Sequence, residues 1–211
     1  MHNKAFAADR KKPRPLKSNV RQTEGQHKGV KMMVEANRPM SSIGFKLMSL
    51  MFKVRDLLQP RWDVLKEAGI ESGFSVLDFG CGPGGYIMPL VELVGPYGKI
   101  HALDIHPLAI QEVRKIAARK GIENIETIES DCCTGLPDNG VDTVLLYDVF
   151  HDLACPDDVL RELHRILKPG GILSFSDHHM QEEEVVTRVT GAGMFRFIRK
   201  GNKTYSFAKA D

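Results

Sequence analysis

The sequence predicts an α/β domain built on a mostly parallel sheet of the nucleotide-binding type. A short apolar run leads into three glycines, Gly80, Gly82 and Gly85, in G-x-G-x-x-G spacing. A helical run and a second strand ending on Asp104 follow. Further strand and helix patterns then alternate, and the chain closes with a hairpin pattern. A strand, a glycine loop, a helix, a strand and an acid in this order are typical of a sheet that binds a nucleoside.

The composition is that of a globular protein with an uneven charge distribution. The chain has 211 residues, of which 42% are hydrophobic and 27% charged, and this fits one domain. The net charge is only +2, but residues 1–40 hold ten Lys/Arg against three Asp/Glu. We expect residues 1–40 to be a basic, disordered tail. It is either a solvated tail or leader, or an electrostatic arm for nucleic acid or an anionic membrane.

Targeting and redox features favour the cytoplasm. No apolar run reaches the ~18 residues that a transmembrane helix needs, and no signal-peptide pattern is present, so we expect no membrane span. The cysteines lack paired zinc spacing and a secretory context, which predicts free thiols in a reducing cytoplasm. They are Cys81, Cys132, Cys133 and Cys155.

Residues 41–68 carry apolar side chains at mainly helical spacing, interrupted by Pro60. This predicts two helices before the sheet. One interpretation is a lid over a substrate pocket, because methionine and phenylalanine side chains adapt to apolar ligands. Another is a helix that packs on the sheet. The third, an interfacial membrane helix, is less favoured because Lys46 and Lys53 only partly segregate onto one face.

The remaining elements follow in order. Apolar and β-branched runs predict strands, and 3.6-residue periodicity predicts the helices between them. Pro169 and Gly170 explain why the helix before the fifth strand stops. The predicted strands are 75–79, 99–104, 125–129, 141–147 and 172–176, with hairpin strands at 194–199 and 203–209. The predicted helices are 87–94, 106–120, 156–167 and 182–190.

The residue types in the glycine loop follow from its task. Gly80 permits the tight turn, Gly82 lets a ligand approach the backbone, and Gly85 allows close helix–strand packing. Asp104 is placed to accept hydrogen bonds from two ribose hydroxyls. A dinucleotide would put its pyrophosphate at the helix N-terminus. Asp78 would repel that pyrophosphate, but it could orient a water, a loop N–H or an ammonium group.

The stretch Val-Leu-Asp-Phe-Gly-Cys-Gly-Pro-Gly-Gly, residues 76–85, resembles motif I of the class I S-adenosylmethionine (SAM) methyltransferases. Residues 148–153 resemble the loop after strand four in the small-molecule, type 11 branch of ubiquinone–menaquinone methyltransferases. Asp148 and Asp152 replace an Asn and a His of that pattern. The resemblance covers residues 70–211. It implies a Rossmann-like, doubly wound sheet of seven strands in the order 3-2-1-4-5-7-6, with strand 7 antiparallel.

The resemblance also implies SAM as the cofactor and a division into a tail (1–40), an N-terminal helical cover (41–72) and a SAM-binding methyltransferase domain (73–211). Asp131 would hold the adenine amino group, and the Cys132 N–H a ring nitrogen. Alternatively, Asp131 caps its own turn. Asp148 is a candidate to orient the methionine ammonium. The expected cofactor-binding residues are Asp78, Gly80, Cys81, Gly82, Gly84, Gly85, Asp104, Ile105, Asp131, Cys132 and Asp148.

The chemistry implied is transfer of the SAM methyl group to a small-molecule acceptor. Since SAM is already activated, the protein mainly aligns the two reactants, and a base is needed only for a protonated nucleophile. His151 is the first candidate base and His178 the second. Each could instead be an ordinary pocket histidine. No metal ligand is assigned, no stable nucleic-acid partner is expected, and no oligomeric state is predicted.

Three alternatives remain open. Asp148 and Asp177 could hold Mg²⁺, as in metal-dependent O-methyltransferases. Cys132, Cys133 and Cys155 could gather arsenite, as in arsenite methyltransferases. The chain could also be a SAM-binding regulatory domain without turnover. DNA amino-methylation is disfavoured, because no Asn/Asp-Pro-Pro-Tyr/Phe motif follows the fourth strand.

Overall fold

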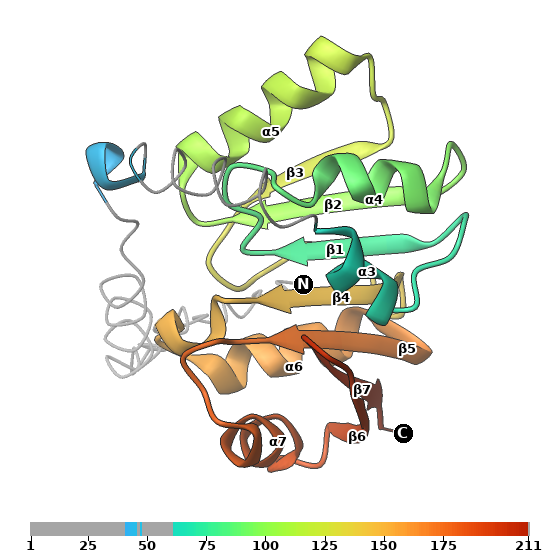
Figure 1. Cartoon of the computed structure of the whole chain (residues 1–211), viewed down its shortest axis with the longest axis vertical. Helices are drawn as coiled ribbons and strands as arrows, with labels where there is room; N and C mark the ends of the chain where they lie inside the picture. Colours follow the sequence, from blue (N-terminus) through green and yellow to red (C-terminus); the bar gives the residue numbers. More distant parts are fainter. Residues whose placement is uncertain (1–40, 46, 48–60, 211) are drawn as a thin grey trace, which may run out of the picture.

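A computed structural model of the chain describes residues 41–45, 47 and 61–210. Its sheet has seven strands in the order β3-β2-β1-β4-β5-β7-β6 (Figure 1). Strands β1 to β5 are parallel, and β7 runs antiparallel to both β5 and β6. The predicted strand order is confirmed. The strands are β1 (Ser75–Phe79), β2 (Lys99–Asp104), β3 (Ile125–Glu129), β4 (Val141–Tyr147), β5 (Leu167–Ser176), β6 (Phe195–Lys200) and β7 (Tyr205–Lys209).

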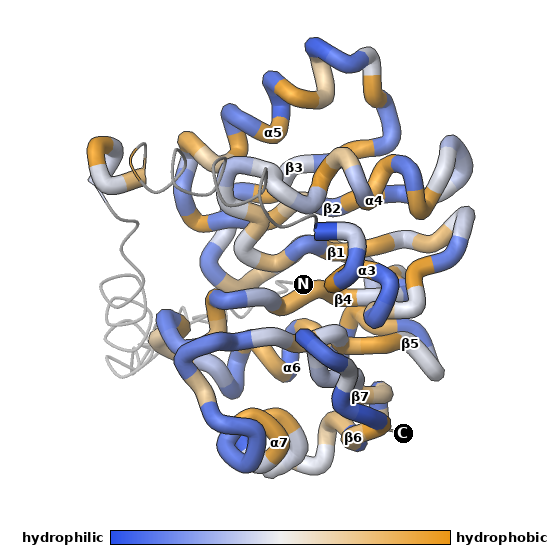
Figure 2. Tube along the Cα trace, viewed as in Figure 1, coloured by the Kyte–Doolittle hydropathy of each residue, from blue (hydrophilic) through white to orange (hydrophobic). Residues whose placement is uncertain are grey.

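Helices connect most of the parallel strands and cover both faces of the sheet, whereas β3 and β4 are joined by a loop. They are α3 (Trp62–Glu67), α4 (Ile87–Val94), α5 (Pro107–Lys120), α6 (Pro156–Ile166), α7 (Glu182–Thr190) and a short 3-10 turn, η1 (Phe150–Asp152). Each long helix is amphipathic because only one side faces the sheet. Figure 2 shows this for α5, whose residues alternate between hydrophilic and hydrophobic along its length. Within the described ranges, none of the helices combines the length and apolarity needed to span a bilayer.

Two hydrophobic cores lie on opposite faces of the sheet. Successive residues of a strand point to opposite faces. Val76 of β1 accordingly packs with α3, α4 and α5, whereas Leu77 packs with α6 and α7. The same alternation places Leu145 and Tyr147 of β4 in the first core. Asp78 lies two residues after Val76 on β1, so its side chain points to the same face of the sheet. It therefore faces α3 and α4, at the carboxyl end of β1.

The carboxyl ends of the parallel strands meet at one edge. In Figure 1 the arrowheads of β1, β4 and β5 point toward the same side of the molecule, where the described N-terminal turn lies. Residues 42–45 and 47 are helical, as predicted. The break predicted at Pro60 and the tail predicted at residues 1–40 lie outside the described residues.

Strand β5 begins earlier than predicted. Residues 168–171 were expected to form a loop before a strand at 172–176, but β5 starts at Leu167, which pairs with Val141. The register then shifts, so that Ile172 pairs with Thr143. Buried Leu167 holds the start of the strand, and the Pro-Gly-Gly stretch bulges out of the ladder because Pro169 has no N–H to donate.

Candidate active site

The glycine loop follows β1 and is fastened to β2. The N–H groups of Gly80 and Cys81 donate to the Leu103 carbonyl at 2.8 and 2.9 Å. Gly82 has a φ of +52° and open space on the side where a Cβ would point. Only glycine adopts this conformation without strain, and no side chain stands between its backbone and a ligand. This arrangement agrees with the expected role of Gly82.

Close helix packing occurs at Gly84. Its φ is +84°, and an added Cβ would lie 3.0 Å from Cδ1 of Ile116 and 3.2 Å from Cγ2 of Val113, both on α5. The sequence pattern assigned this close approach to the neighbouring Gly85. The loop therefore packs on α5 at Gly84, which keeps the start of α4 next to the end of β2.

Asp104 joins the two loops of the expected nucleoside pocket. Its Oδ2 accepts from the Gly82 N–H at 2.8 Å, and its Oδ1 accepts from the His106 N–H at 2.7 Å. Burial raises the pKa of Asp104, and the two backbone hydrogen bonds oppose the rise. A carboxylate has about four acceptor positions. Two backbone donors therefore leave capacity for ribose hydroxyls, the role that the sequence predicts.

Asp78 is a buried acid with an unsatisfied oxygen. The residue is 2% exposed, and its Oδ2 has no hydrogen-bond partner among the described residues. Burial raises the pKa of Asp78 to about 7; the charge of Arg61 opposes this rise and that of Asp104 adds to it. A buried carboxylate oxygen without a donor calls for a cation or a hydrogen-bond donor. With the open face of Gly82, it fits the ammonium-bearing end of SAM.

The adenine side of the pocket is less regular. Asp131 is half-buried, and the Cys132 N–H donates to Oγ of Ser130 at 3.4 Å. The Cys132 N–H, which was expected to meet an adenine ring nitrogen, thus has Ser130 as a partner in this structure, and both roles predicted for Asp131 stay predictions. Beyond the half-buried Ile105, the His106 ring stacks on Phe45 with centroids 4.3 Å apart. An N-terminal side chain therefore covers this end of the pocket.

A histidine and a buried acid form a pair at the ends of β4 and β5. Nδ1 of His151 lies 2.9 Å from Oδ2 of Asp177, whose side chain is 0% exposed, and the His151 N–H donates to the same oxygen at 3.0 Å. Burial alone would raise the pKa of Asp177. Hydrogen bonds from the His151 ring and from the backbone of His179 and His151 outweigh burial and hold that pKa below its usual value. The ionised carboxylate therefore accepts, and Nδ1 of His151 carries the proton.

A second acid–histidine pair lies beside the first. Nδ1 of His178 is 2.8 Å from Oδ1 of Asp148, and the His178 N–H donates to the same oxygen at 3.2 Å. Asp148 has a φ of +52°, which is uncommon for a residue other than glycine. The His178 side chain is 66% exposed, against 25% for His151. The His178 ring is thus less restrained by its surroundings than the His151 ring.

The two pairs could also act as one ligand set. Asp148, Asp177 and His178 offer ligand atoms that all lie within 4.8 Å of one another, which suits a divalent cation. The ring of His179 lies between those of His151 and His178, with centroids at 4.2 and 3.9 Å. In the structure each carboxylate accepts from its own histidine, so the negative charge that would attract a cation is already partly matched.

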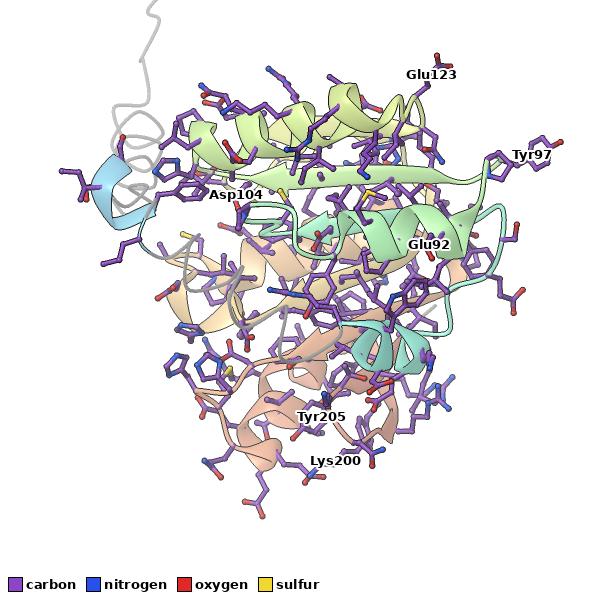
Figure 3. The ribbon with its side chains drawn as sticks, turned by 45° about the horizontal axis from the view of Figure 1, so that its top comes forward. Glu92, Tyr97, Asp104, Glu123, Lys200 and Tyr205 are labelled. Atoms are coloured by element: carbon purple, nitrogen blue, oxygen red, sulfur yellow. The ribbon has the colours of Figure 1, made fainter. Side chains whose placement is uncertain are left out.

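A cavity of about 520 Å³ lies elsewhere. Its lining includes Glu92 near the end of α4 and Glu123 beyond α5, at the amino ends of the strands. Figure 3 shows Asp104 and Tyr97 at opposite ends of the sheet, with Glu123 and Glu92 on the Tyr97 side of Asp104. Ligands of open α/β sheets bind at the carboxyl ends of the strands. We therefore place the active site around Asp78, Asp104 and His151.

Comparison with known proteins identifies the domain. A family model described as "Methyltransferase domain" matches residues 70–206, more than half of the chain. The chain belongs to this methyltransferase family. The match covers the described sheet from just before β1 into β7, so the glycine loop and both acid–histidine pairs lie within the methyltransferase domain.

Individual relatives agree with the family. A demethylmenaquinone methyltransferase of Geobacillus stearothermophilus is 30% identical over 132 residues, which are 62% of this chain and 56% of the relative. The aklanonic acid methyltransferase DauC of Streptomyces sp. (strain C5) is 38% identical over 109 residues, 50% of this chain and 48% of the relative. The solved structure of a SAM-dependent methyltransferase from Aquifex aeolicus has a TM-score of 0.63 at 28% identity and covers 74% of this chain and 96% of its own.

These matches confirm the class I SAM methyltransferase resemblance, including its ubiquinone–menaquinone branch, and SAM as the cofactor. The chain spans about half the length of the curated relatives it matches. The matches do not favour the metal-dependent or regulatory alternatives. An arsenic methyltransferase of Chlamydomonas reinhardtii is 22% identical and shares the fold alone. Burial raises the pKa of Cys132 to about 12, so its thiol stays protonated at neutral pH.

Sequence reasoning missed two features of this site. Asp177 was considered only as a metal ligand, although it follows β5 directly. Because Tyr147 pairs with Ser176, the residues after them, Asp148 and Asp177, are neighbours at the sheet edge. The magnesium alternative already used that proximity, and the part that was missed is the pairing of Asp177 with His151. Arg61 lies beside Asp78 and Tyr86, and no local pattern points to this placement.

Proposed function

We propose that this protein transfers a methyl group from SAM to a small hydroxylated aromatic acceptor, such as a quinol or a phenol, with His151 as the general base. The observation that carries the proposal is the His151–Asp177 pair at the carboxyl ends of β4 and β5. The relatives' names support the acceptor class: one acts on demethylmenaquinone and another on aklanonic acid.

The chemistry assigns a role to each member of the pair. When bound, SAM supplies a methyl carbon on a sulfonium, whose C–S electron pair returns to sulfur as the acceptor attacks. A hydroxylated acceptor must lose a proton in that step, and Nε2 of His151 can take it because Nδ1 is already protonated. Asp177 stays ionised, fixes this tautomer and stabilises the charged ring. Asp177 is thus a positioning residue and His151 the catalytic one.

Two substitutions test the base. His151→Gln should lower kcat by about 10²–10⁴-fold and leave SAM affinity unchanged, because the ring acts on the acceptor. Asp177→Asn should also lower kcat and leave SAM affinity unchanged, since a neutral amide stabilises the charged ring less than a carboxylate does. The matched control is His178→Gln, which removes the exposed ring and should cost only a few-fold. A loss in His178→Gln with full activity in His151→Gln would reassign the base.

The acceptor class is tested by transfer of a labelled methyl group. Quinols, catechols, amines, thiols and arsenite would be offered with and without Mg²⁺. Transfer to quinols or phenols without Mg²⁺ is expected. Transfer only to amines or thiols would refute the acceptor class, and a strict Mg²⁺ requirement would turn Asp148 and Asp177 into metal ligands. Tight SAM binding without any transfer would favour the regulatory alternative.

We also propose the predicted division of the chain, with an N-terminal cover over the pocket and a basic tail before it. The stacking of Phe45 on His106 supports the cover. We further infer a cytoplasmic location, supported by four free cysteines. We infer no stable nucleic-acid partner, since no Asn/Asp-Pro-Pro-Tyr/Phe motif follows β4. Thiol alkylation under denaturing conditions, on protein taken from cells without added reductant, should label all four cysteines; a disulfide would contradict the location.

A further inference from the structure

We propose that Asp152 selects an acceptor that carries a second hydroxyl group on the ring carbon next to the hydroxyl that loses its proton. The inference rests on the proposed function, because it starts from Nε2 of His151 as the atom that takes the proton. It narrows the acceptor from hydroxylated aromatic molecules in general to those with two neighbouring hydroxyl groups. It also assigns a role to a residue at which this chain departs from the loop pattern of its branch.

Asp152 lies at the base atom of the site. Its Oδ2 is 3.4 Å from Nε2 of His151, whereas Asp177 contacts Nδ1, the other nitrogen of the same ring. The Asp152 side chain is 79% exposed, and that of Asp177 is 0% exposed. A ligand that arrives from solvent can therefore reach the Asp152 carboxylate, while the Asp177 carboxylate is available only to the protein.

The backbone that carries His151 and Asp152 is anchored by η1. The Asp152 N–H donates to the Val149 carbonyl at 3.1 Å. Phe150, between them, is 4% exposed, and its ring packs edge-on against Phe175 of β5 with centroids 5.3 Å apart. A buried aromatic side chain holds the turn on the sheet. The Asp152 side chain therefore extends from a fixed position beside the base, although the side chain itself is exposed.

Within the part of the chain that the structure describes, two hydrogen-bond acceptors face each other here without a donor between them. Nδ1 of His151 carries the ring proton, so Nε2 offers a lone pair, and the oxygens of a carboxylate offer only lone pairs. A ligand with two adjacent O–H groups supplies one donor to each of these atoms, which are 3.4 Å apart. One hydroxyl gives its proton to Nε2. The neighbouring hydroxyl donates a hydrogen bond to Asp152 and keeps its proton.

The negative charge around Nε2 narrows the acceptor further. Besides Asp152, the carboxylates of Asp148 and Asp177 lie close together where β4 and β5 end. An acceptor with a carboxylate beside its reacting hydroxyl would bring a further negative charge to this place, and like charges at short range repel each other. The site therefore favours a neutral hydrogen-bond donor at the second position and disfavours an anionic group there.

The test uses three simple acceptors that differ only at the ring carbon next to the reacting hydroxyl. Catechol has a second hydroxyl there, phenol a hydrogen and salicylate a carboxylate. Transfer of a labelled methyl group by the full chain would be measured with each acceptor, under anaerobic conditions and with a metal chelator present. The wild type should show its highest kcat/KM with catechol and its lowest with salicylate.

Asp152→Ala should lower kcat/KM for catechol by about 10- to 100-fold, the size expected for a hydrogen bond to a charged group. It should change kcat/KM for phenol by less than about fivefold, because an exposed carboxylate stabilises the charged His151 ring only weakly. Retained turnover of phenol also shows that the variant is folded. With salicylate the variant should be more active than the wild type, because one repelling charge is gone. Titration of catechol into the complex with S-adenosylhomocysteine should show the same loss of affinity.

The matched control is Asp157→Ala, which removes another exposed acid at the start of α6. It should treat all three acceptors like the wild type. Equal losses with catechol and phenol in Asp152→Ala would overturn the inference, because Asp152 would then act on His151 alone. A preference for catechol that disappears with the chelator would also overturn it, since a bound metal would then hold the second hydroxyl.

The wild type separates this inference from the proposed function on which it rests. Transfer to catechol and phenol with equal kcat/KM would overturn the role of Asp152 and leave the proposed function intact. Absence of transfer to both would overturn the proposed function and this inference with it.

Discussion

Replacing Asp78 with asparagine should make the folded protein more stable at alkaline pH and weaken its hold on SAM. In the folded chain the pKa of Asp78 is raised from 3.8 to about 7, mainly by burial. Between these two values the unfolded chain has released the proton while the folded chain keeps it. The unfolded state therefore binds fewer protons, so the free energy of unfolding falls as pH rises through this window.

The size of the effect follows from the two pKa values. Between about pH 5.5 and about pH 8, ionisation of Asp78 should lower the free energy of unfolding by about 2 kcal/mol, since each pH unit inside the window costs about 1.4 kcal/mol. Asparagine has the same shape and does not ionise. The stability of Asp78→Asn relative to the wild type should therefore rise by about 2 kcal/mol over this range, because the other titrating groups cancel in the difference.

Urea unfolding of both proteins at the two pH values measures this difference. The matched control is Asp63→Asn, because the Asp63 side chain is 66% exposed on α3 and should give the same stability difference at both pH values. If the free energies of unfolding of Asp78→Asn and of the wild type changed equally between the two pH values, the reasoning would be refuted. Asp78 would then ionise in the folded protein as it does in the unfolded chain.

Binding of SAM should show the opposite dependence, because the cationic ligand favours the ionised carboxylate. Between about pH 5.5 and about pH 7 the ionised fraction of Asp78 rises more than tenfold, while an α-amino group with a pKa near 8 stays charged. The affinity of the wild type for SAM should therefore increase about tenfold over this interval. Asp78→Asn should bind SAM weakly, with no such increase.

Three further substitutions test the scaffold around the site. Glu67→Gln should lower the Tm by several degrees, because backbone donors of the hairpin lose a charged acceptor worth about 1–3 kcal/mol. Gly84→Ala should cost about 1–3 kcal/mol in urea unfolding, because a Cβ at a φ of +84° would meet Ile116. In the wild type the Arg165 guanidinium lowers the pKa of Glu162 to about 2. The contribution of Glu162 to the free energy of unfolding is complete above pH 4.5, its pKa in the unfolded chain, and is lost as pH falls toward 2. Glu162→Gln should therefore weaken the fall of that free energy with decreasing pH in this range.

Each of the three has a contrary outcome. An unchanged Tm in Glu67→Gln would mean that the hairpin does not hold α3. Gly135→Ala is the comparison for Gly84→Ala, since Gly135 has a φ of +69° and no neighbour near an added Cβ. If both substitutions lowered the free energy of unfolding equally, backbone strain alone would explain the loss, and the contact with Ile116 would add nothing. If the free energy of unfolding of Glu162→Gln fell with decreasing pH as it does in the wild type, Glu162 would not contribute to the loss of stability in acid.

The parts of the fold that were predictable from the sequence depend on local patterns. The glycine loop, the acid at Asp104 and the alternating strands and helices are each encoded within a few residues, so periodicity and turn chemistry find them. Strand order came from the resemblance. The start of β5 was missed because Leu167 reads equally well as the last residue of a helix. Its pairing with Val141 is a contact between distant segments, and a local pattern does not contain it.

The active site was predictable to the extent that side chains follow strand ends. His151, His178 and the acids Asp78, Asp104 and Asp148 were all expected there on that basis, and their roles stay predictions. The pairing of His151 with Asp177 also required the neighbour relation of β4 and β5, which turns two separate strand ends into one site. Treating Asp177 only as a metal ligand overlooked that a buried acid beside a histidine can instead fix its tautomer.

The placement of Arg61 illustrates a different limit. Its position depends on α3, and α3 is held by Glu67, which is hydrogen-bonded to residues more than 130 positions later in the chain. Three of the four donors to the Glu67 carboxylate are backbone N–H groups, which every residue except proline carries, so no residue type at 202–204 marks the contact. The C-terminal hairpin thus fixes the helix that follows Arg61, and it reaches the glycine loop through the contact of Arg61 with Tyr86.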